Sequence, residues 1–158
     1  MEQKIKTQDA LTTYRIISTA KYTKMDDADK IKIWKIARAL KPFATQFDDE
    51  SSDAAERFKE GFKDFDERFQ KAQQYEIEVR KPNCDASKLP IGAAEYQEFI
   101  SGDFSAYNKL VNDAIKEFAD KEITVEFDKI SEDAFGKLMA SNEWTMAQVV
   151  ALDGIVTE

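Results

Sequence analysis

The sequence predicts a mainly α-helical fold: a long antiparallel helical hairpin or bundle, with a minor two-stranded β element and short C-terminal helices. Three observations lead to this fold class. Apolar residues recur every three or four positions over long stretches, which is the period of an amphipathic helix. The 158 residues include only five Gly and three Pro, which leaves few turn residues for a many-stranded sandwich. Two short segments alternate apolar and polar residues, as strands do.

A chain of this length fits one domain, so we expect a single helical domain over residues 1–158. Its predicted parts are N-terminal helices, a strand with a loop, return helices, and a strand with C-terminal helices, at residues 1–74, 75–92, 93–120 and 121–158. The first helix is predicted from about Thr7 to Lys24, with Thr7 as its N-cap. Its apolar face is formed by Ala10, Leu11, Tyr14, Ile17 and Ala20. Asp26 or Asp27 is expected to cap the second helix.

The strongest pattern is a ladder of apolar side chains that steps along the chain by three or four residues, except for one step of seven, from Phe47 to Ala54, which Ser51 divides. Its members are Ile33, Ile36, Leu40, Phe43, Phe47, Ala54, Phe58, Phe62, Phe65, Phe69 and Ala72. Such a ladder is the seam of a long helix that packs on a partner helix, in the same chain or in a second one. Its phenylalanines could instead line a ligand slot. Pro42 and the acidic stretch 48–53 are expected to kink or break the helix.

Two alternating segments flank the return helices. They cover Tyr75 to Val79 and Ile123 to Phe127. Because an isolated strand is unstable, we expect the two to pair as a small ribbon. Residues 81–90 form a loop with two prolines, and Gly102 is expected to split the helical region 93–120.

Two short helices are predicted at the C-terminus. Ser131 is expected to cap the first, which ends at Asn142. Thr145 and Gln148 have the form of a capping box that opens the second. Trp144 precedes this box and is expected to act as a hydrophobic staple, the alternative being an exposed interface anchor.

The composition offers little for catalysis. The chain has no His and one Cys, which removes the commonest general base near neutral pH and most transition-metal sites. The glycines are isolated, so no phosphate loop is present, and Cys84 has no His to activate it. The acidic stretch 48–53 lacks the spacing of a calcium loop. We therefore expect no enzyme, no cofactor and no catalytic, cofactor-binding or metal-binding residues. The alternative is an enzyme that uses only carboxylates, Tyr or Lys.

The net charge of −8 is unevenly distributed. Residues 1–42 hold ten Lys and Arg against five Asp and Glu, a net charge of +5, and residues 43–158 have a net charge of −13. The basic part is expected to dock on the acidic remainder of its own chain or on an acidic partner. Direct binding of nucleic acid is not expected of an acidic protein. Without a signal peptide, a membrane-spanning run or a second Cys, we expect a cytoplasmic protein without membrane contact.

Trp34 is the clearest candidate for an interface. At 100° per residue, the apolar centre of the second helix lies near Ile33, Ile36, Ala37 and Leu40, and Trp34 falls outside it. Its predicted neighbours complete a candidate interface of Lys30, Ile31, Trp34, Arg38 and Lys41. A Trp beside Arg and Lys is typical of protein interfaces. The alternative is that the first helix folds back over Trp34 and buries it.

Three stretches carry a resemblance to a known family. They read IWKIARALKP at 33–42, EITVEFDKISED at 122–133 and WTMAQVVAL at 144–152. Together they resemble small uncharacterised proteins encoded by tailed bacteriophages and prophages, in which a long helical hairpin leads into an acidic strand-like segment and a terminal helix. The insertion at 82–90 is longer than that family's pattern. The resemblance supplies no catalytic or binding residues and implies a phage-derived, non-enzymatic role.

These observations favour an interaction protein with a protein partner or a second copy of itself, acting as a phage assembly or structural accessory factor in the host cytoplasm or the virion. The alternative is an acidic inhibitor that mimics nucleic acid and blocks a host DNA-binding protein. A net charge of −8 with 23 basic residues interspersed is modest for such a mimic.

Overall fold

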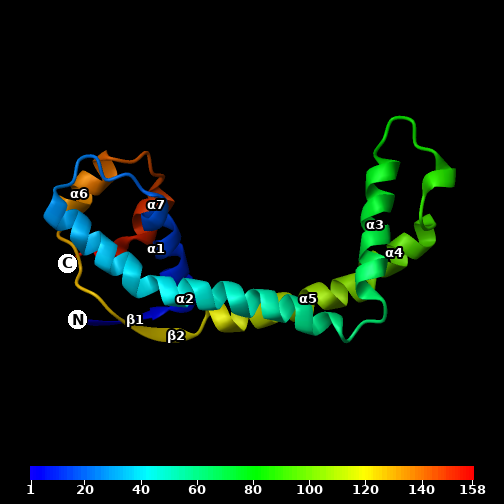
Figure 1. The fold of residues 1–158 in the computed structure, drawn as a ribbon, viewed down its shortest axis with the longest axis horizontal. Coiled ribbons are helices and arrows are strands. Elements are labelled where there is room, and N and C mark those ends of the chain that lie inside the picture. Colours follow the sequence, from blue (N-terminus) through cyan, green and yellow to red (C-terminus); the bar gives the residue numbers. More distant parts are fainter. The chain divides into compact units, whose positions relative to one another are not determined.

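The computed structural model describes residues 1–158 and is mainly helical, with one small antiparallel sheet (Figure 1). Its elements are β1 (Glu2–Lys6), α1 (Thr7–Thr19), α2 (Asp27–Lys59), α3 (Phe65–Val79), η1 (Ala86–Lys88), α4 (Ala93–Ser101), α5 (Asp103–Ala119), β2 (Glu122–Glu126), α6 (Glu132–Ala140), α7 (Met146–Ala151) and η2 (Asp153–Ile155). The predicted fold class is confirmed: α2, with 33 residues, is the long helix of the hairpin, and α6 and α7 are the short C-terminal helices.

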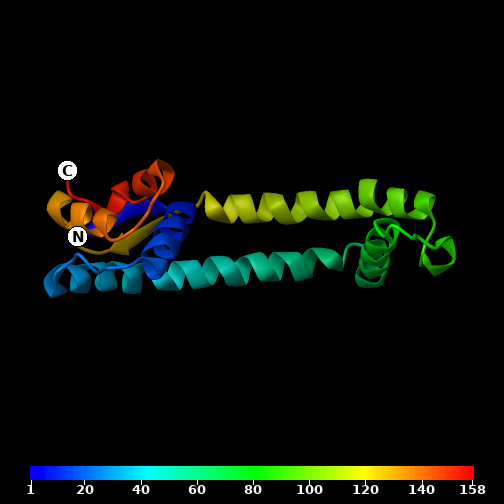
Figure 2. The same cartoon turned by 90° about the horizontal axis from the view of Figure 1, so that it is seen from above.

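The contacts divide the chain into two compact units. Unit 1 contains residues 1–49 and 117–158, and unit 2 contains residues 50–116. Helices α2 and α5 contribute residues to both units, and both chain ends lie in unit 1 (Figures 1 and 2). Each unit has an apolar core of its own.

The sheet of unit 1 joins the start of the chain to its last third. β1 pairs antiparallel with β2, so that Glu2 lies opposite Glu126 and Lys6 lies opposite Glu122. The prediction of a strand at β2 is confirmed, whereas the prediction that Tyr75 to Val79 is its partner is wrong. Burial alternates along β1, but Ile5 is its one apolar residue, so the sequence shows no alternation of apolar and polar side chains there.

The core of unit 1 collects aliphatic side chains from α1, α2 and the C-terminal segments. Its largest side chains that are at most 2% exposed are Ile17, Ile33, Ile36, Leu40, Ile130, Leu138, Leu152 and Ile155. The first part of the apolar ladder thus closes within the chain. Trp144 is half-buried and packs against the same core, which disfavours the alternative that it is an exposed interface anchor.

Local side-chain caps start three of the helices. The Asp29 amide donates to the Asp26 carboxylate at 2.9 Å. The Ser131 hydroxyl accepts the capping hydrogen bond of α6, and Thr145 and Gln148 form the capping box of α7. These predicted caps are confirmed, because such motifs depend only on neighbouring residues.

The first helix differs from its prediction at both ends. It ends at Thr19 rather than Lys24, because the Lys21 amide donates to the Asn142 side chain at 2.8 Å and the connecting segment is held against the end of α6. Thr7 is the first helical residue rather than the N-cap. Its hydroxyl donates at 2.9 Å to the carbonyl of the residue before β2.

Helix α2 runs without interruption through both positions where a break was expected. Pro42 is exposed and lies inside the helix, and the stretch 48–53 is helical throughout. Pro42 removes one backbone hydrogen bond, but Leu40 and Ala44 on either side of it are buried and hold the helix in register. The chain turns only after Lys59, in a segment that ends at Asp64.

The core of unit 2 is aromatic. Phe65, only 5% exposed, lies with its ring centroid 4.3 Å from that of Tyr107 and 5.7 Å from that of Phe99. The Tyr107 hydroxyl donates to the carbonyl of Ala55 at 2.7 Å, which joins α5 to α2 within this unit. Phe62, Phe65 and Phe69 of the ladder therefore pack ring against ring within the chain.

The segment Tyr75 to Val79 belongs to α3 rather than to a strand. Tyr75 lies three residues after the buried Ala72, so it continues the helical face, and its ring stacks on Tyr96 at 4.4 Å. Ile77 is 62% exposed. The alternation of apolar and charged residues in this segment therefore does not reflect a strand with one buried face.

Gly102 separates α4 from α5, as predicted. A Cβ at this position would lie 2.7 Å from the carbonyl oxygen of Glu98, so the close approach requires glycine. Arg68 of α3 donates to the Asp103 carboxylate at 2.6 Å, just after this junction. No helix in the chain combines the length and apolarity that a membrane crossing requires.

Candidate functional site

The five residues predicted as an interface lie together on the first half of α2. At 100° per residue, Lys30, Ile31, Arg38 and Lys41 all fall within about 60° of Trp34 around the helix. Trp34 is 57% exposed and Ile31 is 53% exposed, so the first helix does not bury Trp34. We call these five side chains the Trp34 surface.

The packing of α2 explains why Trp34 faces outward. Ile33 and Ile36 point into the core of unit 1. Trp34 follows Ile33 by one residue, which turns its side chain by about 100° from the core. Ile17 of α1 forms part of the wall beside Trp34 but leaves the indole ring exposed.

A groove with a volume of 310 Å³ lies beside the Trp34 ring. It is lined by Ile17, Tyr22, Lys30, Ile33, Trp34 and Ala37. The Tyr22 hydroxyl donates to the carbonyl of Ile17, and burial raises the pKa of Tyr22. Since this hydroxyl already has a partner, the groove offers mostly apolar walls, with the Lys30 ammonium group at its edge.

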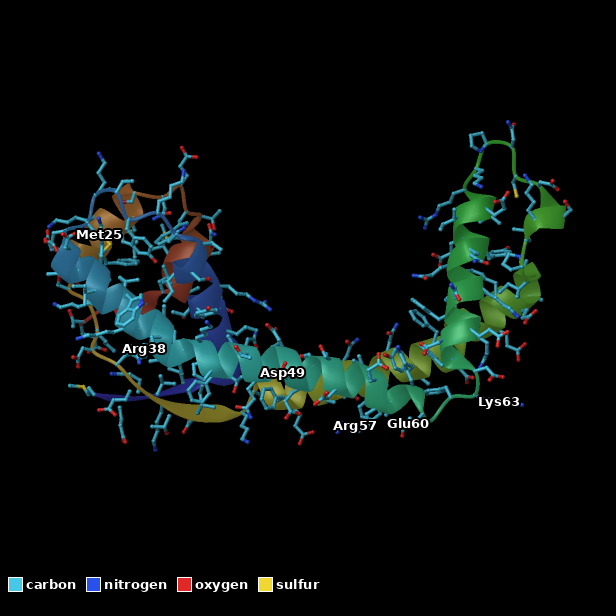
Figure 3. All side chains as sticks on the ribbon, in the orientation of Figure 1. Met25, Arg38, Asp49, Arg57, Glu60 and Lys63 are labelled. Carbon is cyan, nitrogen blue, oxygen red and sulfur yellow. The ribbon has the colours of Figure 1, made fainter.

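Three cations, Lys30, Arg38 and Lys41, share the side of α2 on which Trp34 lies, and the one carboxylate among them, Asp27, pairs with Lys30. The Arg38 guanidinium lies 5.3 Å from the centroid of the Trp34 ring, a cation–π contact. Figure 3 places Arg38 on the part of α2 that lies between Met25 and Asp49. Arg38 and Lys41 form no ion pair with any carboxylate of the chain. Their charges are therefore available to a ligand.

The basic part of the chain is only weakly engaged by the acidic remainder. Of the basic side chains in residues 1–42, only Arg15 pairs with a carboxylate of residues 43–158, at 3.6 Å from Asp48. Lys30 pairs locally with Asp27 at 3.8 Å. Within unit 1, docking of the basic part on acidic residues therefore accounts for one side chain and leaves the Trp34 surface exposed.

Three other hollows on the surface have lining residues that differ from those of the groove beside Trp34. One of 370 Å³ lies between β1, α1, α7 and η2 and has Asp9 as its one charged residue. One of 320 Å³ in unit 1 is lined by Met1, Lys32, Lys35, Glu126, Phe127 and Asp128, and one of 240 Å³ in unit 2 by Arg68, Lys71, Ile91, Glu95, Glu98 and Phe99. No group of three or more His, Cys, Asp or Glu side chains is placed to hold a metal ion.

Unit 2 contains one tyrosine and carboxylate pair with a perturbed pKa. The Tyr96 hydroxyl donates to the Glu76 carboxylate, and this hydrogen bond, with a smaller effect of burial, raises the pKa of Tyr96. Neither side chain lines the hollows described above. A tyrosine with a raised pKa remains a hydrogen-bond donor, so the pair ties α4 to α3. Cys84 is exposed in the connection between these helices.

Comparison of the chain with protein-family models, with curated proteins and with solved structures finds no match. The site is therefore interpreted from the chemistry of this chain.

Sequence reasoning found the exposed side of the groove but missed its walls. Ile17 was assigned to the buried face of the first helix, and Tyr22 was placed inside that helix, whose true end is Thr19. Ala37 was counted with the apolar centre of the second helix. No sequence signal reveals that these three side chains form a concavity, because it depends on how α1 and α2 pack.

Proposed function

We propose that this protein is a non-enzymatic interaction protein whose Trp34 surface contacts another protein. The observation that carries the proposal is the exposure of Trp34 and Ile31 next to an apolar groove and two cations without carboxylate partners. Trp and Arg are enriched among the residues that dominate binding energy at protein interfaces.

The apolar area that a partner could cover at Trp34 is large enough to support a binding role. A large aromatic side chain buries about 150–250 Å². Covering the exposed part of Trp34, at about 25 cal/mol per Å², would stabilise a complex by roughly 3 kcal/mol before the costs of association. Ile31, also more than half exposed, would add to this. A single exposed Leu or Ile is common on protein surfaces, but two large apolar side chains beside a groove form a patch that fits a partner.

We further propose that the partner is a virion protein or a protein of virion assembly. The resemblance of three stretches of the chain to small proteins of tailed bacteriophages and prophages supports this assignment. The proposal predicts that the partner is a structural component, or that the chain itself assembles into a homo-oligomer.

The test is affinity capture with three forms of the protein. Tagged wild type, Trp34→Glu and Ile77→Glu are incubated with lysate of cells that carry the gene, and the retained proteins are identified by mass spectrometry. Ile77→Glu is the matched control, because Ile77 is equally exposed but lies in unit 2. The complex is then rebuilt from purified proteins and its mass is measured by light scattering.

We expect wild type and Ile77→Glu to retain the same partner and Trp34→Glu to lose it. Capture of capsid, tail or assembly proteins would support the phage role, and capture of unrelated proteins would contradict it. If Trp34→Glu retains every partner, or if the wild type is a monomer that retains none, the Trp34 surface is not a binding site.

A further inference from the structure

We propose that the segment which binds the Trp34 surface is acidic, with a large apolar side chain that enters the groove beside Trp34. This inference rests on the proposed function and specifies the chemistry of the partner: a short acidic segment of another protein, rather than a lipid surface, a nucleic acid or a second copy of this chain.

The groove defines the apolar part of the ligand. Its 310 Å³ lie at the lower end of the range for ligand pockets, which suits a Leu, Met or Phe side chain. Its floor and walls come from Ile17, Ile33 and Ala37, and the hydroxyl of Tyr22 is already engaged with the backbone. An inserted apolar side chain would meet few unsatisfied polar groups there, so its burial carries little desolvation cost.

The cations define the charged part of the ligand. Arg38 and Lys41 lie on the same side of α2 as Trp34, and neither has an ion pair in the chain. Lys30, at the edge of the groove, has only an exposed pair with Asp27. Exposed pairs of this kind contribute little to stability, so a ligand carboxylate can replace Asp27 at small cost. Carboxylates that flank the inserted side chain would therefore find three cations within reach.

The whole-chain charge argues against an extended anionic partner. The protein carries a net charge of −8, which repels a polyanion or an anionic membrane that faces much of its surface. A short segment experiences mainly the local charges, because screening at physiological salt limits electrostatic interactions to about 8 Å. Local positive charge on an acidic protein thus selects a small acidic ligand over a large anionic surface.

The first experiment is selection from a displayed library of random 16-residue peptides. Peptides that bind immobilised wild-type protein are retained, and those that also bind the Trp34→Ala variant are removed at each round. We expect the enriched peptides to carry at least one large apolar residue flanked by Asp or Glu. Because Trp34 is exposed, Trp34→Ala is expected to fold, which circular dichroism verifies.

The second experiment measures the contribution of the cations. The most enriched peptide is labelled with fluorescein, and its binding is followed by anisotropy. We expect Trp34→Ala and the double variant Arg38→Glu/Lys41→Glu each to lose at least tenfold in affinity. The control is Lys63→Glu/Lys88→Glu, which changes the net charge equally at two exposed lysines of unit 2 and should bind like wild type.

The outcomes separate this inference from the proposed function. Trp34-dependent peptides that are neutral or basic would overturn the inference and leave the proposed function intact. A library without Trp34-dependent peptides would contradict both. Trp34-dependent binding to vesicles that contain phosphatidylserine would assign the surface to membranes and overturn the inference. If light scattering shows a dimer that Trp34→Ala dissociates, the surface binds a second copy of this chain, and the inference is likewise overturned.

Discussion

Single polar side chains decide where the helices of unit 1 begin. At the start of α2, the Asp26 carboxylate accepts the amide of Asp29. This hydrogen bond is the main reason why the pKa of Asp26 lies below its ordinary value of 3.8, and the positive charge of Lys137 lowers it further. The ionised form is therefore the one that the folded protein favours.

This shift predicts a pH dependence of stability. Because the pKa is lower in the folded state, the stabilising effect of Asp26 is present above about pH 4 and is lost as the pH falls through the lowered pKa. Asp26→Ala should therefore lower the melting temperature at pH 7, with a smaller difference from wild type at pH 2.5.

The matched control is Asp26→Asn, whose amide oxygen can accept the Asp29 amide at any pH. Its melting temperature should stay closer to that of wild type at pH 7. Calorimetry of the three proteins across this pH range measures the effect, and a difference between wild type and Asp26→Ala that is constant with pH would contradict it.

The residues that sequence reasoning placed correctly act over short distances in the chain. The caps at Asp26, Ser131 and Thr145 each bond within three residues. Thr7 was misassigned because its hydroxyl bonds to Lys121, 114 residues away, and no local motif encodes that contact. The exposed side of α2, on which Trp34 lies, was also predictable from neighbouring residues, because the helical period of 100° per residue determines which side chains share a face.

At the scale of elements, the aromatic ladder gives α3 its place in unit 2. Phe65 opens α3 and touches rings from α4 and α5, so it connects three helices. The same helix ends in Ile77 and Val79, which are exposed and make no comparable contacts. The stability of unit 2 should therefore depend on the start of α3 much more than on its end.

Phe65→Ala should destabilise the protein by about 3–5 kcal/mol, because it removes a buried ring and leaves a cavity. Ile77→Ala should change the free energy of unfolding by less than about 0.5 kcal/mol. Urea unfolding followed by far-UV circular dichroism compares the two. Equal effects would show that the aromatic rings do not form the core of unit 2.

The misassigned strand shows where element prediction reaches its limit. From Tyr75 to Val79 the residues alternate between apolar and charged, yet they continue the helix that Phe65, Phe69 and Ala72 begin, and Tyr75 extends its packed face. Over five residues both periods fit, and the longer helical register decides. The true partner of β2 is β1, which pairs across more than a hundred residues, and that long-range contact leaves no trace in the local pattern.

At the scale of the whole molecule, the two cores share no buried residue. The apolar ladder crosses from one unit to the other along α2, and the expectation of a single domain rested on the length of the chain. The boundary between the two units could not be predicted from the ladder. It depends on which other helices and strands pack against each half of the ladder.

Separate cores should open separately in native-state hydrogen exchange. Phe65→Ala should raise the exchange rates of amides in α3 and α4, with those of β1, β2 and α6 unchanged. Leu138→Ala, which truncates a fully buried side chain of unit 1, should do the reverse. Mass spectrometry of peptide fragments measures both. Faster exchange across all five elements in both variants would mean that the units unfold as one.

The pairing of β1 with β2 determines which unit can fold first during translation. Residues 1–49 leave the ribosome first, but their core also needs side chains from residues 117–158. The residues of unit 2 are contiguous, so its rings can pack in the interval, before the C-terminal segments are made. Until then, residues 1–49 of the nascent chain expose the unpaired strand β1 and the aliphatic side chains of α1 and α2. Such surfaces bind chaperones, and they make a prematurely terminated chain prone to aggregate.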